Sequence, residues 1–389
     1  MPDNVPADTK DMVAGGIRFT VASRPQRRFS NSQTVTNLAG STSFQPIQLP
    51  ATGFVRKVSL FFTVSVTSAS AGAVVAGDGP WNLISGITIT DATGQAIMQP
   101  INGYNLYLVN KYFSTGSMEN TNIPRAWSNP HLGPDYAYSS TSTTGTATFR
   151  LDLDFEQDYN SGYGCIPNLD SNASLQLKVD VAPYSNAFSG TTVSAATVSM
   201  RVAQYYWAPV GASVGGVAAM TQPVGFGDYV ETRYETQTLS ASTENTVQVT
   251  NRGGLVKGMI AISRAAGVRT AYTAGSNVGL LLDNNAIDEG IPIEEHNDMI
   301  RRMYGYIGTD LTTSYAPLTA GTLPGLDRGV HVLNFAGLSG GRDSWLATRV
   351  GSLFQVKLTP GASATSLEIV TQLAQVKDAG AFYSESALN

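Results

Sequence analysis

The sequence predicts an all-β protein with two similar β-sandwich units in tandem. Several segments alternate apolar and polar residues with a period of two, as strands do when one face is buried. Segments of the first half also return in the same order in the second half, although loop lengths differ. Only 14% of the 389 residues are Asp, Glu, Lys or Arg, whereas about 25% is typical of soluble domains. Such low charge predicts that copies of the chain cover much of its surface.

The clearest strand lies after Gly53. Val58, Leu60 and Phe62 alternate with Ser59 and Phe61, which places the first three on a buried face. The same period occurs in residues 149–155, 175–181 and 198–202. Long irregular loops join these strands, and this arrangement predicts a sandwich with Greek-key connections.

A unit of strand, turn and helix occurs twice. Asp91 and Pro100 recur with the same spacing as Asp283 and Pro292, and apolar strand residues precede each pair. Proline is favoured at the first position of a helix, where its missing N–H has no partner to lose. Both prolines are therefore predicted to begin a helix.

Further matches keep the same order along the chain. GLVKGMIAI at Gly254 corresponds to GFVRKVSLF at Gly53, and SLFQVKL at Ser352 corresponds to SLQLKVDV at Ser174. The matches keep their order, and the number of residues between a segment and its match decreases along the chain. This indicates a second copy with shorter loops. An uncharged Gly-, Ala- and Pro-rich segment at 209–227 indicates the boundary. The predicted organisation is an N-terminal arm at 1–30, a first unit at 31–208, a linker at 209–230, a second unit at 231–376 and a C-terminal tail at 377–389.

The N-terminal arm carries a small basic cluster, Arg24, Arg27 and Arg28, without sustained periodicity. One interpretation is a flexible terminus. The other is a segment that a neighbouring subunit or an anionic lipid surface orders, which makes these arginines the candidate membrane-facing or neighbour-facing residues.

Composition argues against several classes of protein. The net charge of −5 argues against direct binding of nucleic acid, which needs a groove rich in Lys and Arg. The single Cys165 excludes an internal disulfide and a cysteine-based zinc site. No apolar run is long enough to span a bilayer, and the first residues lack the features of a secretory signal. We therefore expect synthesis and folding in a reducing cytoplasm.

Candidate catalytic patterns lack their structural context. Ser213 in GASVG and Ser339 in GLSGG match the lipase pattern, but neither follows a buried strand and precedes a long helix. His131, His296 and His331 are isolated from one another in the sequence, so no metal-binding histidine cluster is expected. His296 lies among acidic residues, where a solvated helix start is the simpler interpretation.

Acidic residues near the end of the predicted strand at 149–155 suggest a glycosidase as an alternative. Asp152, Asp154 and Glu156 could flank a sugar ring, although the polar face of a strand explains the same spacing. Aromatic residues at 205–207 could stack on sugars or bases, but such residues also fill cores and subunit interfaces. No catalytic residue, cofactor site or metal site is therefore assigned.

The chain resembles the double jelly-roll major capsid proteins of tectivirus-like bacteriophages, which are tailless, icosahedral and enclose a membrane. The resemblance lies in GFVRKVSLFFTV at Gly53, GPWNLISGITITDATGQ at Gly79, INGYNLYLVN at Ile101 and IPNLDSNASLQLKVDV at Ile166. It covers much of the first unit and little of the second.

This resemblance implies two tandem eight-stranded jelly rolls with short helices in the loops. It further implies a homotrimeric, pseudo-hexagonal capsomer that tiles an icosahedral shell and is not an enzyme. Penton proteins, minor capsid proteins and an internal membrane contacted by the termini are the implied partners. The loops at 114–146 and 309–328 are candidates for outward towers or intersubunit contacts. A lectin-like or host-attachment sandwich is the alternative binding module, and a carbohydrate-active enzyme is the third class.

Overall fold

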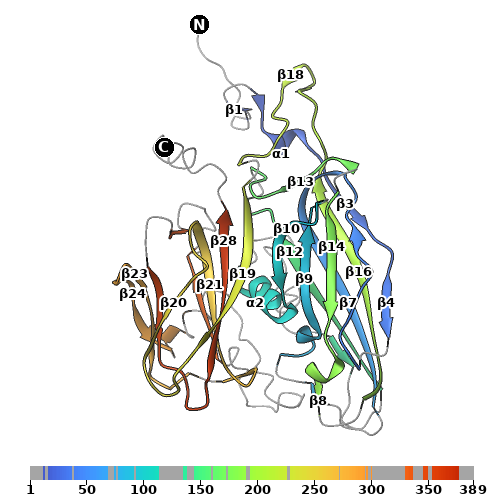
Figure 1. The fold of residues 1–389 in the computed structure, drawn as a ribbon. Coiled ribbons are helices and arrows are strands. Elements are labelled where there is room, and N and C mark those ends of the chain that lie inside the picture. Colours follow the sequence, from blue (N-terminus) through green and yellow to red (C-terminus); the bar gives the residue numbers. More distant parts are fainter. Residues whose placement is uncertain are drawn as a thin grey trace.

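The computed structural model contains two sandwich units side by side (Figure 1). It describes residues 12–375, except 14–15, 37–38, 69–73, 76–77, 92, 114–134, 138–143, 159–160, 172–173, 190–192, 226–227, 271, 294, 297–298, 300–328, 336–344 and 349–352. The expected loops at 309–328 and, for the most part, at 114–146 lie outside the described residues.

The first unit consists of two antiparallel sheets. The larger sheet contains β3 (Pro25–Phe29), β4 (Gln33–Thr36), β7 (Gly53–Ser68), β11 (Asp135–Ala137), β12 (Thr144–Asp154), β13 (Ile166–Asn168) and β16 (Val193–Trp207). The smaller sheet contains β5 (Thr42–Ser43), β6 (Ile47–Gln48), β9 (Ile84–Thr90), β10 (Ala96–Ile101) and β14 (Gln176–Val181).

The second unit has the same construction. Its larger sheet contains β19 (Tyr229–Thr238), β21 (Leu255–Ala265), β22 (Val268–Arg269), β25 (Val330–Asn334), β26 (Leu346–Ala347) and β28 (Ser366–Gln375). Its smaller sheet contains β20 (Asn245–Gln248), β23 (Asn277–Leu282), β24 (Asn285–Pro292) and β27 (Phe354–Leu358).

The order of strands confirms the predicted repeat. In the larger sheets, β4–β16–β7–β12 corresponds to β19–β28–β21–β25. In the smaller sheets, β6–β14–β9–β10 corresponds to β20–β27–β23–β24. Two independent sheets thus have one connectivity in both halves, as a duplicated fold requires.

Short elements complete the described chain. They are β1 (Met12–Val13), β2 (Gly16–Ile17), α1 (Phe19–Ala22), β8 (Val74–Val75), the 3₁₀ turns η2 (Trp81–Leu83) and η5 (Tyr184–Asn186), α2 (Gly103–Phe113), β15 (Phe188–Ser189), β17 (Ser213–Val214) and β18 (Val217–Ala218). The predicted linker thus contains the β17–β18 hairpin, and β19 begins within its last residues.

The period-two interpretation of the first unit is confirmed. Val58, Leu60 and Phe62 are buried in β7, and Leu177 is buried in β14. The Phe62 ring stacks on that of Phe149 from the adjacent β12, with centroids 5.0 Å apart. These side chains form the core between the two sheets, since alternate strand residues point to the same face.

The predicted start of the first helix is wrong. Pro100 belongs to β10, and α2 begins three residues later at Gly103. The side-chain oxygen of Asn102 accepts a hydrogen bond from the backbone N–H of Asn105 at 2.8 Å. This N-terminal cap satisfies a donor that has no partner within the helix. In the second unit Pro292 likewise belongs to a strand, as the last residue of β24, and Ile293 is helical.

Candidate assembly interfaces

Helix α2 lies between the two units. All eleven of its residues are buried. It packs against β12, β9 and η2 of the first unit and against β21 and β25 of the second unit. The helix therefore has no solvent face, because both of its sides are covered.

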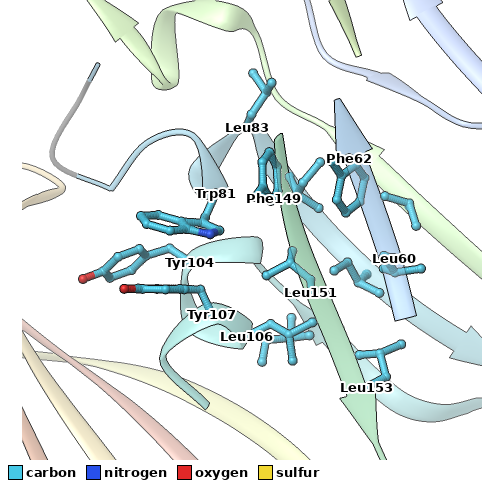
Figure 2. Close-up of a cluster of buried hydrophobic side chains, with 14 of the residues drawn as sticks. Leu60, Phe62, Trp81, Leu83, Tyr104, Leu106, Tyr107, Phe149, Leu151 and Leu153 are labelled. Carbon is cyan, nitrogen blue, oxygen red and sulfur yellow. The ribbon is translucent and has the colours of Figure 1, made fainter. Parts of the chain in front are cut away.

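Aromatic side chains anchor α2 to the first unit. The Trp81 ring of η2 stacks on the Tyr107 ring, with centroids 3.8 Å apart, and Tyr104 lies beside both (Figure 2). Gly103 allows this approach, since a Cβ there would lie 2.3 Å from the Trp81 carbonyl oxygen. The GPWNL segment and the INGYNLYLVN segment thus meet in space.

One helix side chain closes the free edge of β12. The Asn110 amide donates to the Asp152 carbonyl at 2.7 Å and accepts from the Asp152 N–H at 2.8 Å. These are the two bonds that a neighbouring strand would make. The amide therefore caps this part of the sheet and fixes the helix to it.

A charged network joins the two units. The Arg264 guanidinium donates to Asp78 at 2.5 Å and to Glu368 at 2.6 Å, and Arg269 donates to Asp78 at 2.6 Å. Glu368 also accepts from the Asn105 amide at 2.5 Å. Arg264 and Arg269 come from the second unit, whereas Asp78 comes from the first. Such pairs fix one arrangement, because leaving a buried charge alone is costly.

A buried lysine crosses the same interface. Lys257 Nζ donates to the Phe113 carbonyl at 2.7 Å and to Gln157 Oε1 at 2.8 Å. Burial lowers the pKa of Lys257 to about 7, and nearby Asp154 opposes this shift. Gly258 is next to it, where a Cβ would lie 2.4 Å from the Phe113 ring. The close contact therefore needs glycine at this position.

The acidic residues that suggested a glycosidase have structural partners. Asp152 pairs with Arg150 at 2.7 Å and with Lys57 at 3.7 Å. Burial raises its pKa, but the two cations outweigh this effect, so its pKa is lowered. Glu156 accepts hydrogen bonds from Arg56 Nε and Trp207 Nε1, both at 2.6 Å. Burial outweighs Arg56 here and raises the pKa of Glu156.

The structure corrects the extent of the N-terminal arm. Arg27 and Arg28 belong to β3, which pairs with β16, and Arg24 comes directly before it. All three arginines are exposed. The pairing of Tyr205 with Arg27 shows that this segment completes the larger sheet of the first unit. The arginines therefore lie on a sheet edge, which the lack of periodicity did not reveal.

The histidines are not all isolated. The ring centroids of His296 and His331 lie 3.9 Å apart in the second unit, and both side chains are buried. Burial and the neighbouring His296 lower the pKa of His331. The rings are inclined by only 31°, which does not direct their in-plane lone pairs to one metal ion. His131 lies outside the described residues.

The lipase pattern has no support from the described structure. Ser213 is exposed in the β17–β18 hairpin, where the next element is the strand β18 and not a helix, and Ser339 lies outside the described residues. Within the described part of the chain, no group of three or more His, Cys, Asp or Glu side chains could hold a metal. No described helix has the length and apolar character needed to cross a bilayer.

Comparison with known proteins decides the fold. No family model and no curated protein sequence matches the chain. The crystal structure of the STIV major capsid protein matches 94% of this chain and 100% of its own, with a TM-score of 0.62 and 11% identity. The atomic structure of Sulfolobus Turreted Icosahedral Virus matches 94% of this chain and 93% of its own chain, with a TM-score of 0.64 and 13% identity.

The quasi-atomic model of the PBCV-1 virus capsid matches 90% of this chain and 94% of its own chain, with a TM-score of 0.55 and 11% identity. These structures are double jelly-roll capsid proteins. This chain has the double jelly-roll fold. In the double jelly roll, α2 and the charged network connect the two rolls. Sequence reasoning missed this interface between the rolls, although Lys257 within the apolar run GLVKGMIAI was a signal of it.

Proposed function

We propose that this protein is the major capsid protein of an icosahedral virus. The observation that carries the proposal is the double jelly-roll likeness over at least nine-tenths of both chains in the three comparisons above. The low proportion of charged residues in the chain agrees with a surface that is largely covered by other subunits.

The proposed assembly unit is a homotrimer. Two rolls per chain and three chains give a six-lobed, nearly hexagonal outline, which suits the faces of a closed shell. Neighbouring capsomers, penton proteins and minor capsid proteins would then contact its sides, and the virion would be its location after synthesis in the host cytoplasm. An internal membrane, contacted through the termini, completes the proposal for a tailless bacteriophage.

The test is the oligomeric state of the purified protein. Size-exclusion chromatography with light scattering should give a trimer, and negative-stain images should show six-lobed particles that form sheets or shells. A stable monomer at micromolar concentration would contradict the proposal. Saturable binding to a glycan array by that monomer would instead support the lectin-like alternative.

A further inference from the structure

Two imidazole rings lie in the core of the second roll. In β25, Val332 joins the apolar cluster that contains the α2 side chains, whereas the next residue, Leu333, joins the second roll's own cluster. Because alternate residues of a strand point to the same face, His331 points into the second roll, as Leu333 does. His331 is 1% exposed, and His296, from the segment that follows β24, is 7% exposed.

The two rings contact each other directly. Their centroids are 3.9 Å apart, and the Tyr272 ring meets the His331 ring edge-on, with centroids 6.4 Å apart. The Tyr272 hydroxyl donates to the Ala261 carbonyl at 2.9 Å. Neither nitrogen of His331 has a hydrogen-bond partner among the described residues. A buried polar group without a partner costs stability and is uncommon in native cores, so an apolar side chain of similar size would stabilise this core more.

Charged side chains of the neighbouring elements make their contacts at the interface between the rolls or at the surface. They are Lys257 and Arg264 of β21, Arg269 of β22, Lys357 of β27, Glu368 of β28, and Glu295 next to His296. Among the described residues, His296 is the one neighbour whose charge shifts the pKa of His331. No described carboxylate therefore compensates a proton on His331.

We propose that the contact between His296 and His331 is an acid-sensitive switch that holds the second roll closed only while the rings are neutral. A proton on His331 places a charge in an apolar core, and a second proton on His296 would place two like charges in adjacent rings. Both changes favour a state in which β25 and the segment after β24 separate and reach water. The inference goes beyond the proposed function, since it holds for any oligomeric state.

The direction of the pH dependence follows from the titration of His331. Burial, and then His296, lowers the pKa of His331 well below its ordinary value of 6.5. An opened or unfolded chain therefore binds a proton at His331 more readily than the closed roll does. The stability that the neutral ring contributes is fully present above about pH 6.5 and is lost as the pH falls below it. From about pH 7.5 to about pH 5.5, this group alone should raise the unfolding constant about tenfold.

Urea unfolding of the full-length protein tests the proposal. On acidification from about pH 7.5 to about pH 5.5, the unfolding constant of the wild type should rise about tenfold more than that of His331→Phe, whose ring binds no proton. His331→Gln, neutral at both pH values, gives the same comparison if the larger phenylalanine prevents folding. Tyr272→Phe is the matched control in the same core, and it should respond to acid as the wild type does. Equal responses of the wild type and the His331 variants would overturn the proposal.

Hydrogen exchange of the wild type needs no variant and locates the change. After correction for the intrinsic effect of pH on exchange, peptides that contain His296 or His331 should exchange about tenfold faster at about pH 5.5 than at about pH 7.5. Peptides from β7 and β12 of the first roll should keep their protection. Equal loss of protection in both rolls, or no loss in either, would overturn the proposal. Trimer formation, measured separately at about pH 7.5, tests the proposed function, so the failure of one leaves the other intact.

Discussion

At the scale of single residues, the charges buried between the rolls are the most informative feature. Lys257 is 2% exposed, and it donates hydrogen bonds to two uncharged acceptors, the Phe113 carbonyl and Gln157 Oε1. Burial disfavours the ammonium form more than nearby Asp154 favours it, which is why the pKa of Lys257 is about 7. The stability of the protein should therefore depend on pH.

We expect Lys257→Met to reduce this pH dependence. The pKa of about 7 in the folded state lies below the ordinary value of 10.5, so the folded protein binds fewer protons than the unfolded chain between these values. Stability therefore rises with pH in that window, by at most about tenfold in the folding constant per pH unit. The cost of burying the ammonium is fully present below about pH 7. Between about pH 7 and about pH 10, the thermal unfolding temperature should rise less for the variant than for the wild type.

Loss of two hydrogen bonds offsets part of any gain in stability from Lys257→Met. The Phe113 carbonyl and Gln157 lose their donor, at a cost of about 1–3 kcal/mol that does not depend on pH. The slope against pH, rather than absolute stability, is therefore the measurement. Lys357→Met, at a lysine with a 44% exposed side chain, is the control. An unchanged slope for Lys257→Met would contradict the assigned pKa.

A second residue prediction concerns the face assignment of β7. Phe62→Asp should abolish the proposed soluble trimer, because it removes a buried ring and places a charge in the core at a cost of several kcal/mol. Leu177→Asp should do the same in β14. Thr63→Asp, at the exposed next residue of β7, should give normal protein. Analytical size exclusion of the three variants distinguishes these outcomes, and normal trimer from both core variants would refute the assignment.

At the scale of elements, α2 serves both rolls. Its aromatic residues pack on η2, its Asn110 amide closes β12, and its C-terminal carbonyl accepts from Lys257. A substitution in α2 should therefore lower the stability of the whole subunit and not only that of one loop.

Asn110→Ala should destabilise the protein by about 2–4 kcal/mol. The substitution leaves both the N–H and the carbonyl of Asp152 without their partner, and each unpaired buried group costs about 1–3 kcal/mol. Differential scanning calorimetry should show a lower unfolding temperature. Asn31→Ala, at an exposed asparagine, should leave it unchanged. A normal unfolding temperature for Asn110→Ala would mean that the edge of β12 does not need the amide.

At the scale of the whole molecule, the two rolls behave as one body because their contact is buried and charged. The main apolar cluster contains side chains from both rolls, and Asp78, Arg264 and Glu368 lie beside it. The proposed role in a shell requires a fixed angle between the lobes, and this network favours one angle.

The double variant Asp78→Ala with Glu368→Ala should uncouple the rolls. Without the two carboxylates, Arg264 and Arg269 lose the acidic partners described above, at a cost of about 3–5 kcal/mol for a broken buried pair. Calorimetry should show one transition for the wild type, and two transitions or a much lower single one for the variant. Glu244→Ala removes an exposed pair with Lys357 and should have an effect below about 1 kcal/mol. A variant that unfolds like the wild type would show that apolar packing alone holds the rolls together.

The sequence by itself determined the strands, their buried faces and the duplication. Period-two patterns such as that of Val58, Leu60 and Phe62 are local and follow from the geometry of a strand. The collinear matches fixed the tandem arrangement, because a duplicated fold preserves order along the chain. The sequence did not give the start of α2 correctly. The helix begins after Asn102, whose side chain caps it by a hydrogen bond, and not at Pro100.

Only the tertiary structure decided which residues meet across the two rolls. Asp78 and Arg264 are far apart in the sequence, and no period or spacing brings them together. The same holds for His296 and His331, and for β3, whose exposed residues gave no alternation although it pairs with β16. Long-range contacts depend on how complete sheets pack, whereas sequence patterns report only which side of a strand or helix is covered.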